Sequence, residues 1–245
     1  MPLKAIIFDV DGTLAETEET HRRAFNQAFA EAGEPWRWSA DDYRALLTTT
    51  GGRERIQRYL DEAGISAHPE TVRALHARKN ALYAAFVAQS AVTPRPGVMR
   101  LIEQARARGV MLAIATTTSR ANLAALMRYA FGTESAGWFA AMAVGEDVAV
   151  KKPDPEVYRR VLSSLALDAA ECVAIEDSRN GLDAARACGI ATLVTPSFYT
   201  QAEAFDGAAL VCPDLAAIDL TMLEAMVADH TPTIEALPTI GHPRA

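Results

Sequence analysis

Short apolar runs alternate along the chain with longer segments that have helical periodicity. The apolar runs predict strands at residues 3–8, 110–115, 139–144, 172–175, 190–194 and 210–212. Helical segments precede four of the later runs, at 98–108, 119–129, 156–166 and 182–188. Unbroken apolar strands joined by helices are typical of a parallel sheet that helices cover on both faces. The pattern therefore predicts an α/β fold.

One long insertion interrupts this alternation after the first strand. Residues 16–93 contain four helical patterns, at 18–32, 41–47, 53–63 and 71–88, where a single strand–helix–strand unit takes roughly 30 residues in all. We therefore expect a core domain formed by 1–15 and 94–229, and an α-helical cap domain at 16–93. Ligands of open α/β sheets bind at the carboxyl ends of the strands, so the cap is expected to lie over the site. Residues 230–245 contain three prolines and are expected to be a tail.

Composition and charge narrow the possible partners. The 245 residues carry a formal net charge of −7, whereas nucleic-acid binding gains affinity by neutralising phosphates, so no nucleic-acid partner is expected. Local basic clusters can still bind small anions. No apolar run approaches the ~18 residues of a membrane span, and the first run is too short for a secretory signal, so no membrane association is expected.

Three cysteines indicate the compartment. Cys172, Cys188 and Cys212 share no spacing typical of a metal site and lie among apolar neighbours. We interpret them as buried thiols of a reducing compartment, with a redox or metal role as the alternative. This interpretation favours a cytoplasmic location.

Two carboxylates follow the first predicted strand. In the run Asp9-Val10-Asp11-Gly12-Thr13, alternation along an extended chain lets Asp9 and Asp11 point toward one pocket while Val10 points away. A plain Asp-Gly turn is the alternative interpretation. After the second strand, Thr116, Thr117, Thr118 and Ser119 lead into a helix. Their hydroxyls and the helix amides could hold a phosphate, or Ser119 could simply cap the helix.

A lysine and an acidic pair follow the next two predicted strands. Lys152 stands just before Pro153 and could place its ammonium beside a phosphate or a carboxylate. Glu176 and Asp177 follow the fourth strand and, with Asp9, predict a cluster of oxygen ligands suited to Mg²⁺. A nucleophile, an acid/base, hydroxyls, a lysine and an acidic pair at strand ends of one sheet indicate phosphoryl transfer to a carboxylate.

These motifs carry a family resemblance. Asp9 to Thr13, Thr116, Lys152-Pro153 and Glu176-Asp177 resemble the four motifs of the haloacid-dehalogenase-like hydrolases, and the resemblance covers nearly the whole chain. It implies a Rossmann-like sheet with a helical cap. The longer stretches 15–26, 46–56 and 115–119 resemble the CbbY-type sugar-phosphate phosphatases, which remove xylulose 1,5-bisphosphate, an inhibitor of Rubisco. Relatives with the same cap are β-phosphoglucomutases or phosphoglycolate phosphatases.

The resemblance implies roles for the core residues. Asp9 would be the nucleophile that forms an aspartyl-phosphate, and Asp11 would protonate the leaving alcohol and then deprotonate the attacking water. Mg²⁺ would be held by the Asp9 carboxylate, the Asp11 backbone carbonyl and Asp177, with Glu176 in or next to the ligand set. The transferring phosphoryl group would be bound by Thr116, Thr117 and Lys152.

The resemblance also implies substrate contacts around the cap. They comprise Glu18, the loop Gly51-Gly52-Arg53-Glu54-Arg55, the helical residues His76, Arg78 and Lys79, and Thr118, Ser119 and Asn122 of the core. A glycine pair lets the backbone approach a ligand and arginines can fork onto a phosphate. By the residues alone, a helix–helix turn with solvated basic side chains is the alternative.

The implied function is a Mg²⁺-dependent phosphatase for a small phosphosugar, and the resemblance favours conversion of xylulose 1,5-bisphosphate to xylulose 5-phosphate. A sugar-phosphate mutase, which shares Asp9, Asp11 and His21, and a phosphoglycolate phosphatase are the enzymatic alternatives. A non-catalytic binding module is a further alternative, which the two intact aspartates disfavour. We expect a monomer, because a cap of this size can close a site without a partner.

Overall fold

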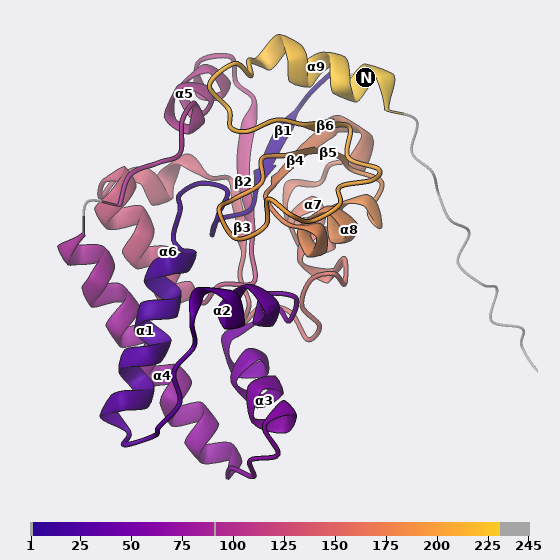
Figure 1. Ribbon diagram of the computed structural model, residues 1–245. Coiled ribbons are helices and arrows are strands. Elements are labelled where there is room, and N and C mark those ends of the chain that lie inside the picture. The colour runs from indigo at the N-terminus through magenta and orange to yellow at the C-terminus, as the bar shows by residue number, and fades with distance from the viewer. Residues whose placement is uncertain (1, 91, 231–245) are drawn as a thin grey trace, which may run out of the picture.

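One parallel sheet forms the centre of the molecule (Figure 1). The computed structural model describes residues 2–90 and 92–230. Its six strands follow the order β3-β2-β1-β4-β5-β6, and every pair of neighbours is parallel. They are β1 (Ala5–Phe8), β2 (Met111–Ala115), β3 (Ala141–Ala143), β4 (Cys172–Glu176), β5 (Ala191–Val194) and β6 (Leu210–Val211). The predicted α/β fold is confirmed.

Helices cover both faces of this sheet. Ile6 and Phe8 pack on one face with α5 (Val98–Ala107), α6 (Arg120–Leu126) and α9 (Leu220–Asp229). Ala5 and Ile7 pack on the other face with α7 (Glu156–Leu165) and α8 (Arg179–Arg186). Because both faces are buried, β1 and β2 are apolar at every position and β4 is apolar up to its last residue, Glu176, as the unbroken runs predicted.

The helices of the core differ from the sequence predictions in three ways. Helix α8 begins at Arg179, before the predicted residue 182, because the Ser178 side chain caps it by accepting from the Gly181 amide. Helix α6 passes into a π-helical turn at Met127–Phe131. Helix α9 was not predicted. Short 3₁₀ turns lie at Ser135–Trp138 and Ala169–Glu171.

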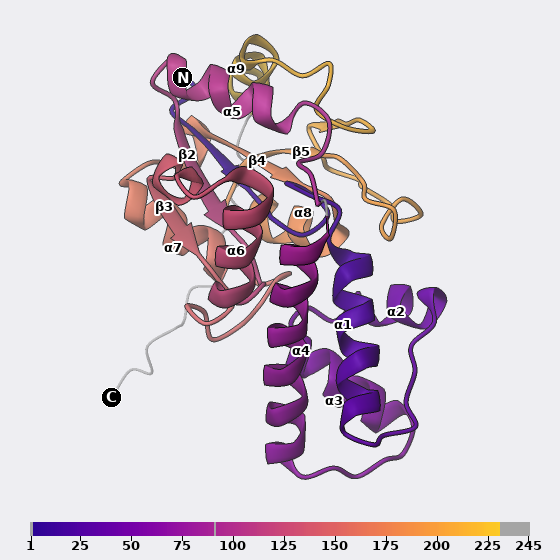
Figure 2. The same cartoon turned by 90° about the vertical axis from the view of Figure 1, so that its left-hand side faces the viewer.

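A bundle of helices stands beyond the carboxyl ends of the strands (Figure 2). It contains α1 (Glu18–Glu31), α2 (Ala40–Leu46), α3 (Gly52–Glu62) and α4 (Pro69–Gln89), which correspond to the four predicted helical patterns. We call residues 18–89 the helical insert. It has an apolar cluster of its own, rich in aromatic rings such as Phe25, Phe29, Trp38 and Tyr43. The exact domain boundaries stay a prediction.

The cysteines are only partly as expected. Cys172 is buried, whereas Cys188 and Cys212 are half-buried. Burial raises the pKa of Cys172 to about 12 and that of Cys188 to about 11, so neither forms a thiolate near neutral pH.

In the described part of the chain no helix is both long and apolar enough to cross a membrane. The predicted tail beyond His230 lies outside the described residues.

Candidate active site

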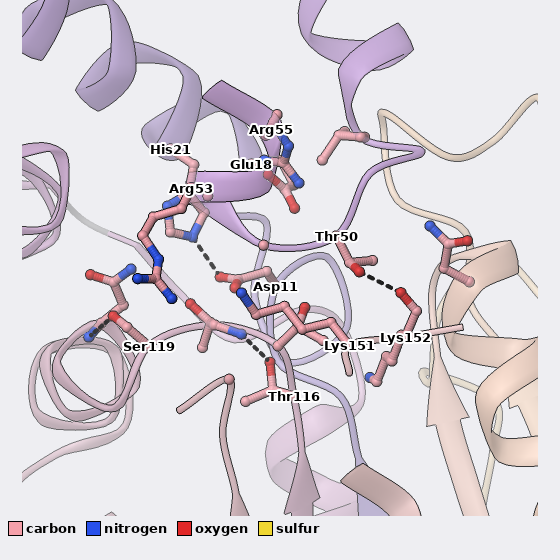
Figure 3. A pocket seen from close by; sticks show the side chains of 18 of the residues that line it. Asp11, Glu18, His21, Thr50, Arg53, Arg55, Thr116, Ser119, Lys151 and Lys152 are labelled. Carbon is pink, nitrogen blue, oxygen red and sulfur yellow. Dashed lines mark hydrogen bonds and ion pairs between the residues drawn. The ribbon is translucent and has the colours of Figure 1, made fainter. Parts of the chain in front are cut away.

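A cavity of about 450 Å³ lies between the carboxyl ends of the strands and the helical insert (Figure 3). The sheet side contributes Asp9, Asp11 and Lys152, and the insert contributes residues of α1, α3 and α4. Direct bonds join the two sides: Thr50 Oγ1 donates to the Lys152 carbonyl, and Asn180 Nδ2 donates to the Thr48 carbonyl at 3.1 Å. The insert therefore covers the strand ends, which is where the sequence placed the cap.

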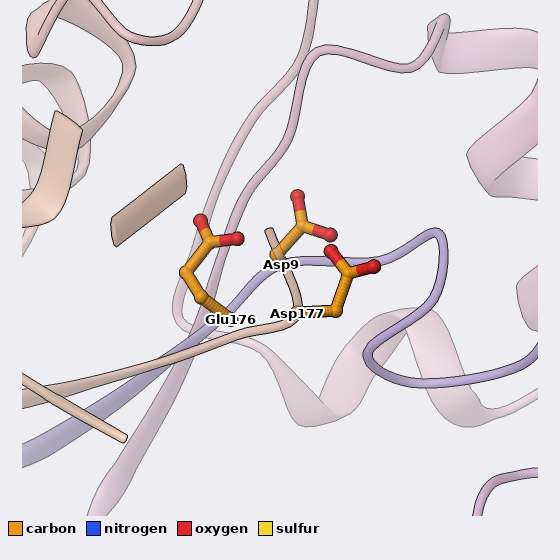
Figure 4. A group of neighbouring side chains, drawn as sticks. All are labelled: Asp9, Glu176 and Asp177. Carbon is orange, nitrogen blue, oxygen red and sulfur yellow. The ribbon is translucent and has the colours of Figure 1, made fainter. Parts of the chain in front are cut away.

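Three carboxylates gather at the floor of this cavity (Figure 4). Asp9, Glu176 and Asp177 each offer an oxygen, and these oxygens lie within 4.8 Å of one another. Two glycines make room for them. A Cβ at Gly12 would lie 2.3 Å from Asp177 Oδ2, and one at Gly181 would lie 1.9 Å from Glu176 Oε2. Both positions therefore exclude a side chain.

Lys152 neutralises part of this charge. Its ammonium donates to Asp9 Oδ1 at 2.7 Å, to Glu176 Oε1 at 2.6 Å and to the Ala115 carbonyl at 2.8 Å. The Tyr158 hydroxyl also donates to Glu176 Oε1, at 2.5 Å. Although burial lowers the pKa of Lys152, Asp9 and Glu176 outweigh it and raise the pKa above its usual value, so the ammonium stays charged.

The cluster still carries more negative than positive charge. Burial and the neighbouring Glu176 raise the pKa of Asp9 to about 7, against the opposing effect of Lys152. Burial, Asp9 and Glu176 likewise raise the pKa of Asp177 well above its usual value. Glu176 Oε2 is buried and has no hydrogen-bond partner among the described residues. Clustered carboxylates with an unused buried oxygen fit a small divalent cation with oxygen ligands, such as Mg²⁺.

Asp11 belongs to a separate network that reaches into the insert. Thr17 Oγ1 donates to Asp11 Oδ1 at 2.6 Å, and His21 Nε2 lies 3.0 Å from the same oxygen. His21 Nδ1 lies 2.7 Å from Lys79 Nζ, and its ring stacks on Tyr83 at 4.0 Å. Because an ionised carboxylate only accepts, this network assigns the His21 proton to Nε2, so that Nδ1 accepts from Lys79.

The charge state of Asp11 follows from these contacts. Burial raises its pKa, but His21 and the bond from Thr17 outweigh burial and hold the pKa below its usual range. Asp11 is therefore a base in this state. The pKa of Lys79 is lowered to about 7, chiefly by burial. The pKa of His21 is also lowered, by burial and by Lys79.

The hydroxyl-rich segment after β2 lines the cavity throughout. Thr116 is buried, and its hydroxyl accepts from the Thr118 amide at 3.2 Å. Ser119 caps α6 by accepting from the Asn122 amide, so the simpler of the two interpretations holds for Ser119, although it also lines the cavity. Asn122 is buried and donates to Asn80 Oδ1 of α4 at 3.1 Å.

Most of the expected cap contacts also line the cavity. They are Glu18, Gly51, Gly52, Arg53, Arg55, His76 and Lys79. Gly51 has a φ of +91°, and a Cβ on Gly52 would lie 2.6 Å from the His76 ring, so the glycine pair permits close packing over the cavity. Burial, followed by Lys79 and Arg53, lowers the pKa of His76 to about 3, which leaves its ring neutral.

Two expected contacts lie elsewhere. Arg78 is exposed and forms an ion pair with Glu31 on α1, while its neighbours Ala77 and Lys79 line the cavity. Successive residues of a helix point about 100° apart, so Arg78 and Lys79 cannot share one direction. Glu54 does not line the cavity and instead accepts from Lys151 Nζ at 2.5 Å. Arg78 and Glu54 therefore do not line the cavity in this arrangement, and their contacts with the substrate stay a prediction.

Several cavity residues were missed by the sequence analysis. They include Thr50, Arg73, Asn80, Lys151, Asn180, Thr200 and Glu203. Lys151 and Thr50 are sequence neighbours of Lys152 and Gly51, so proximity to a motif could have indicated them. Arg73, Asn80 and Thr200 carry no local signal, because only the packing of α4 and of the segment after β5 brings them to the cavity.

Comparison with known proteins identifies the family of this chain. The family model for haloacid dehalogenase-like hydrolases matches residues 3–189. Protein CbbY of Rhodobacter capsulatus is 49% identical over 217 residues, which cover 89% of this chain and 96% of that protein. Crystal structures of CbbY from Rhodobacter sphaeroides have been solved with phosphate and, for an Asp-to-Asn mutant, with xylulose 1,5-bisphosphate. Both have a TM-score of 0.85 at 46% and 45% identity, and cover 87% of this chain and 95% of theirs.

The chain therefore belongs to the haloacid dehalogenase-like hydrolase family, as its motifs predicted. Within that family it is similar to the CbbY proteins over most of its length, and its enzyme class is that of a phosphatase.

Proposed function

We propose that the protein is a Mg²⁺-dependent phosphatase that removes one phosphate from a sugar bisphosphate, with xylulose 1,5-bisphosphate as the preferred substrate and xylulose 5-phosphate as the product. The observation that carries this proposal is the charge of the cavity. Lys152 supplies a cation beside Asp9 on the sheet side, and Arg53 points into the same cavity from the insert (Figure 3). Two separate cationic positions suit a substrate with two phosphates.

Asp9 is the proposed nucleophile. Its carboxylate attacks phosphorus, the bond to the leaving oxygen breaks, and an aspartyl-phosphate forms. Lys152 holds Asp9 in place from one side, while Thr116 and the Thr117 amide are proposed to bind the phosphoryl oxygens. Asp9, Glu176, Asp177 and the Asp11 carbonyl would hold Mg²⁺, which when bound supplies positive charge that keeps Asp9 ionised and offsets the charge of the phosphoryl group.

Asp11 is proposed to move the proton. It must carry a proton to release the sugar alcohol, although its contacts keep it ionised in this structure. A phosphate dianion bound beside Asp11 repels its carboxylate and raises its pKa, so substrate binding itself favours the protonated form of Asp11. Once the alcohol leaves, the Asp11 carboxylate takes a proton from the water that hydrolyses the aspartyl-phosphate.

The insert is proposed to bind the phosphate that stays on the sugar. Arg53 is suited to fork onto this group, and the neutral His76 ring beside it can donate a hydrogen bond. These groups meet the substrate only when the insert lies over the strands, so the binding energy of the second phosphate stabilises the closed arrangement.

A panel of phosphosugars tests the proposal. We expect kcat/KM to be at least tenfold higher for xylulose 1,5-bisphosphate than for xylulose 5-phosphate, since one charge-assisted contact contributes about 1.5–3 kcal/mol. Arg53→Ala should narrow this ratio and leave p-nitrophenyl phosphate hydrolysis almost unchanged. Gln57→Ala is the control, because Gln57 lies on the same helix, is exposed and bonds Asp61 one turn further on.

Two results would contradict the proposal. An equal loss for both xylulose phosphates in Arg53→Ala would show that the loop around Gly51 only stabilises the insert. Formation of a phosphosugar isomer with little inorganic phosphate would identify a mutase instead.

A further inference from the structure

The cavity-facing carboxylate of Glu18 is held by a buried network in the insert. Glu18 is the first residue of α1, and its Oε2 accepts a hydrogen bond from the Tyr43 hydroxyl at 2.6 Å. Arg55 Nη1 donates to the same hydroxyl at 2.8 Å, and its guanidinium carbon lies 5.0 Å from the Tyr43 ring centre. Tyr43 itself is fully buried and does not line the cavity.

The direction of these bonds is fixed by chemistry. A guanidinium has no acceptor, so Arg55 can only donate to the Tyr43 oxygen. The single proton of that hydroxyl must then point at Glu18, which accepts it. Burial, more than any neighbour, raises the pKa of Tyr43 well above its usual value, so the hydroxyl keeps this proton at any physiological pH. Tyr43 is therefore a donor of fixed direction.

The ring of Tyr43 has little freedom to move. It packs against Phe25 and Trp38 of the insert, with ring centres 6.2 and 6.1 Å away. Tyr199, from the segment after β5, meets it edge-on at 5.4 Å. A rigid donor of this kind orders a carboxylate that would otherwise sample several rotamers.

We propose that Tyr43 is a positioning residue which aims the Glu18 carboxylate at a hydroxyl of the substrate lying between its two phosphates. This inference rests on the proposed function and narrows the substrate class. Only Oε2 of Glu18 is engaged by Tyr43, so Oε1 can accept from a substrate hydroxyl. A carboxylate or a phosphate at that position is repelled, which selects polyhydroxylated phosphosugars over phosphorylated acids such as phosphoglycolate.

The test compares two substrates that differ only in oxygen substituents between the phosphates. Xylulose 1,5-bisphosphate carries hydroxyls there, and pentane-1,5-diol bisphosphate carries none. In Tyr43→Phe we expect KM for the xylulose compound to rise about tenfold, as for one lost bond to a charged group, with kcat within about twofold. KM for the diol compound should change by less than about twofold, because this compound has no hydroxyl that could donate to Glu18.

Further variants separate positioning from stability. Glu18→Gln should reproduce the selective rise in KM, and the double variant should be no worse than the worse single variant, since both act on one contact. Tyr59→Phe is the matched control, because Tyr59 packs against the same aromatic cluster and does not line the cavity. It should leave both KM values unchanged.

Each outcome decides the matter. A rise in KM for both bisphosphates in Tyr43→Phe, or no rise for either, overturns the positioning role. If the wild type prefers no bisphosphate over a monophosphate, the proposed function fails. In that case the effect of Tyr43→Phe on KM is compared for xylulose 5-phosphate, which carries hydroxyls, and pentyl phosphate, which carries none, and this comparison still tests the role of Tyr43. Equal KM values of the wild-type enzyme for the hydroxylated and the hydroxyl-free compound overturn the inference outright.

Discussion

The ring of Tyr199 meets the ring of Tyr43 edge-on, with centres 5.4 Å apart and planes at 82°. Tyr199 follows β5 in sequence, yet it is buried within the aromatic cluster of the helical insert. Its hydroxyl donates to Glu19 of α1 at 2.6 Å. The next residue, Thr200, donates to the carbonyl of Asp177 at 2.7 Å. One short segment thus joins the packing of the insert to the backbone of Asp177, a residue of the active-site cluster.

Tyr199 should therefore contribute strongly to stability. We expect Tyr199→Ala to lower the free energy of unfolding by about 3 kcal/mol, since it empties a packed aromatic site. Tyr199→Phe should cost only about 1 kcal/mol, because it removes one hydrogen bond. Urea denaturation measures both, with Phe198→Ala as a control, as Phe198 is 59% exposed. A similar loss in the Phe198 control would contradict this account.

Asp9→Asn should abolish turnover and leave the fold intact. An amide cannot attack phosphorus, and covalent catalysis leaves no alternative nucleophile in the proposed scheme. The substitution has nearly the same size and removes one of three clustered carboxylates, so the variant should melt near or above the wild-type temperature. Phosphate release and thermal melting check both parts. Activity within about tenfold of the wild type would refute the nucleophile assignment.

Asp11→Asn should show a dependence on the leaving group. A sugar alkoxide needs a proton to depart, whereas nitrophenolate does not. We expect the burst of aspartyl-phosphate formation to fall far more with a phosphosugar than with p-nitrophenyl phosphate, as rapid-quench measurements would show. Equal losses with both substrates would mean that Asp11 only supports the structure around Thr17 and His21.

Removal of divalent cations should inactivate the enzyme reversibly. Without a cation, the Asp9 pKa of about 7 leaves part of this carboxylate protonated at neutral pH. We expect EDTA to eliminate phosphate release and Mg²⁺ to restore it, and Asp177→Ala to raise the Mg²⁺ concentration needed for half-maximal activity. Full turnover after exhaustive chelation would contradict the role given to the three carboxylates.

Lys79 should make stability depend on pH in a defined direction. Burial first, and then Arg55, lower its pKa in the folded protein to about 7, whereas an unfolded lysine titrates near 10.4. Between these values the unfolded chain binds the extra proton, so this group makes the folded state more stable as the pH rises. The stability of the wild type relative to Lys79→Met should therefore increase from pH 7 to pH 9, by up to about 1.4 kcal/mol per pH unit. Urea denaturation at both values checks this, and a difference that is constant or falls with pH would contradict it.

The sequence alone determined the sheet and the chemistry on its edge. Residues 5–8 and 172–175 are buried on both faces of the sheet, so their apolar runs are unbroken and easily recognised. Asp9, Glu176 and Asp177 stand at or directly after the end of a strand, and parallel strands bring their carboxyl ends to one edge. Lys152 lies in the turn that leads from β3 into α7. The proximity of the three acidic residues followed from topology, without knowledge of any long-range contact.

Only the tertiary structure decided how the insert meets that edge. Arg78 and Lys79 are neighbouring basic residues, yet the rotation of α4 directs one to Glu31 and the other to His21. Arg55 lines the cavity, as predicted, but only the structure shows that it also donates to the Tyr43 hydroxyl, which in turn donates to Glu18. Tyr199 lies far from both in sequence. Such contacts depend on the relative placement of helices, and short-range patterns in a sequence carry no record of that placement.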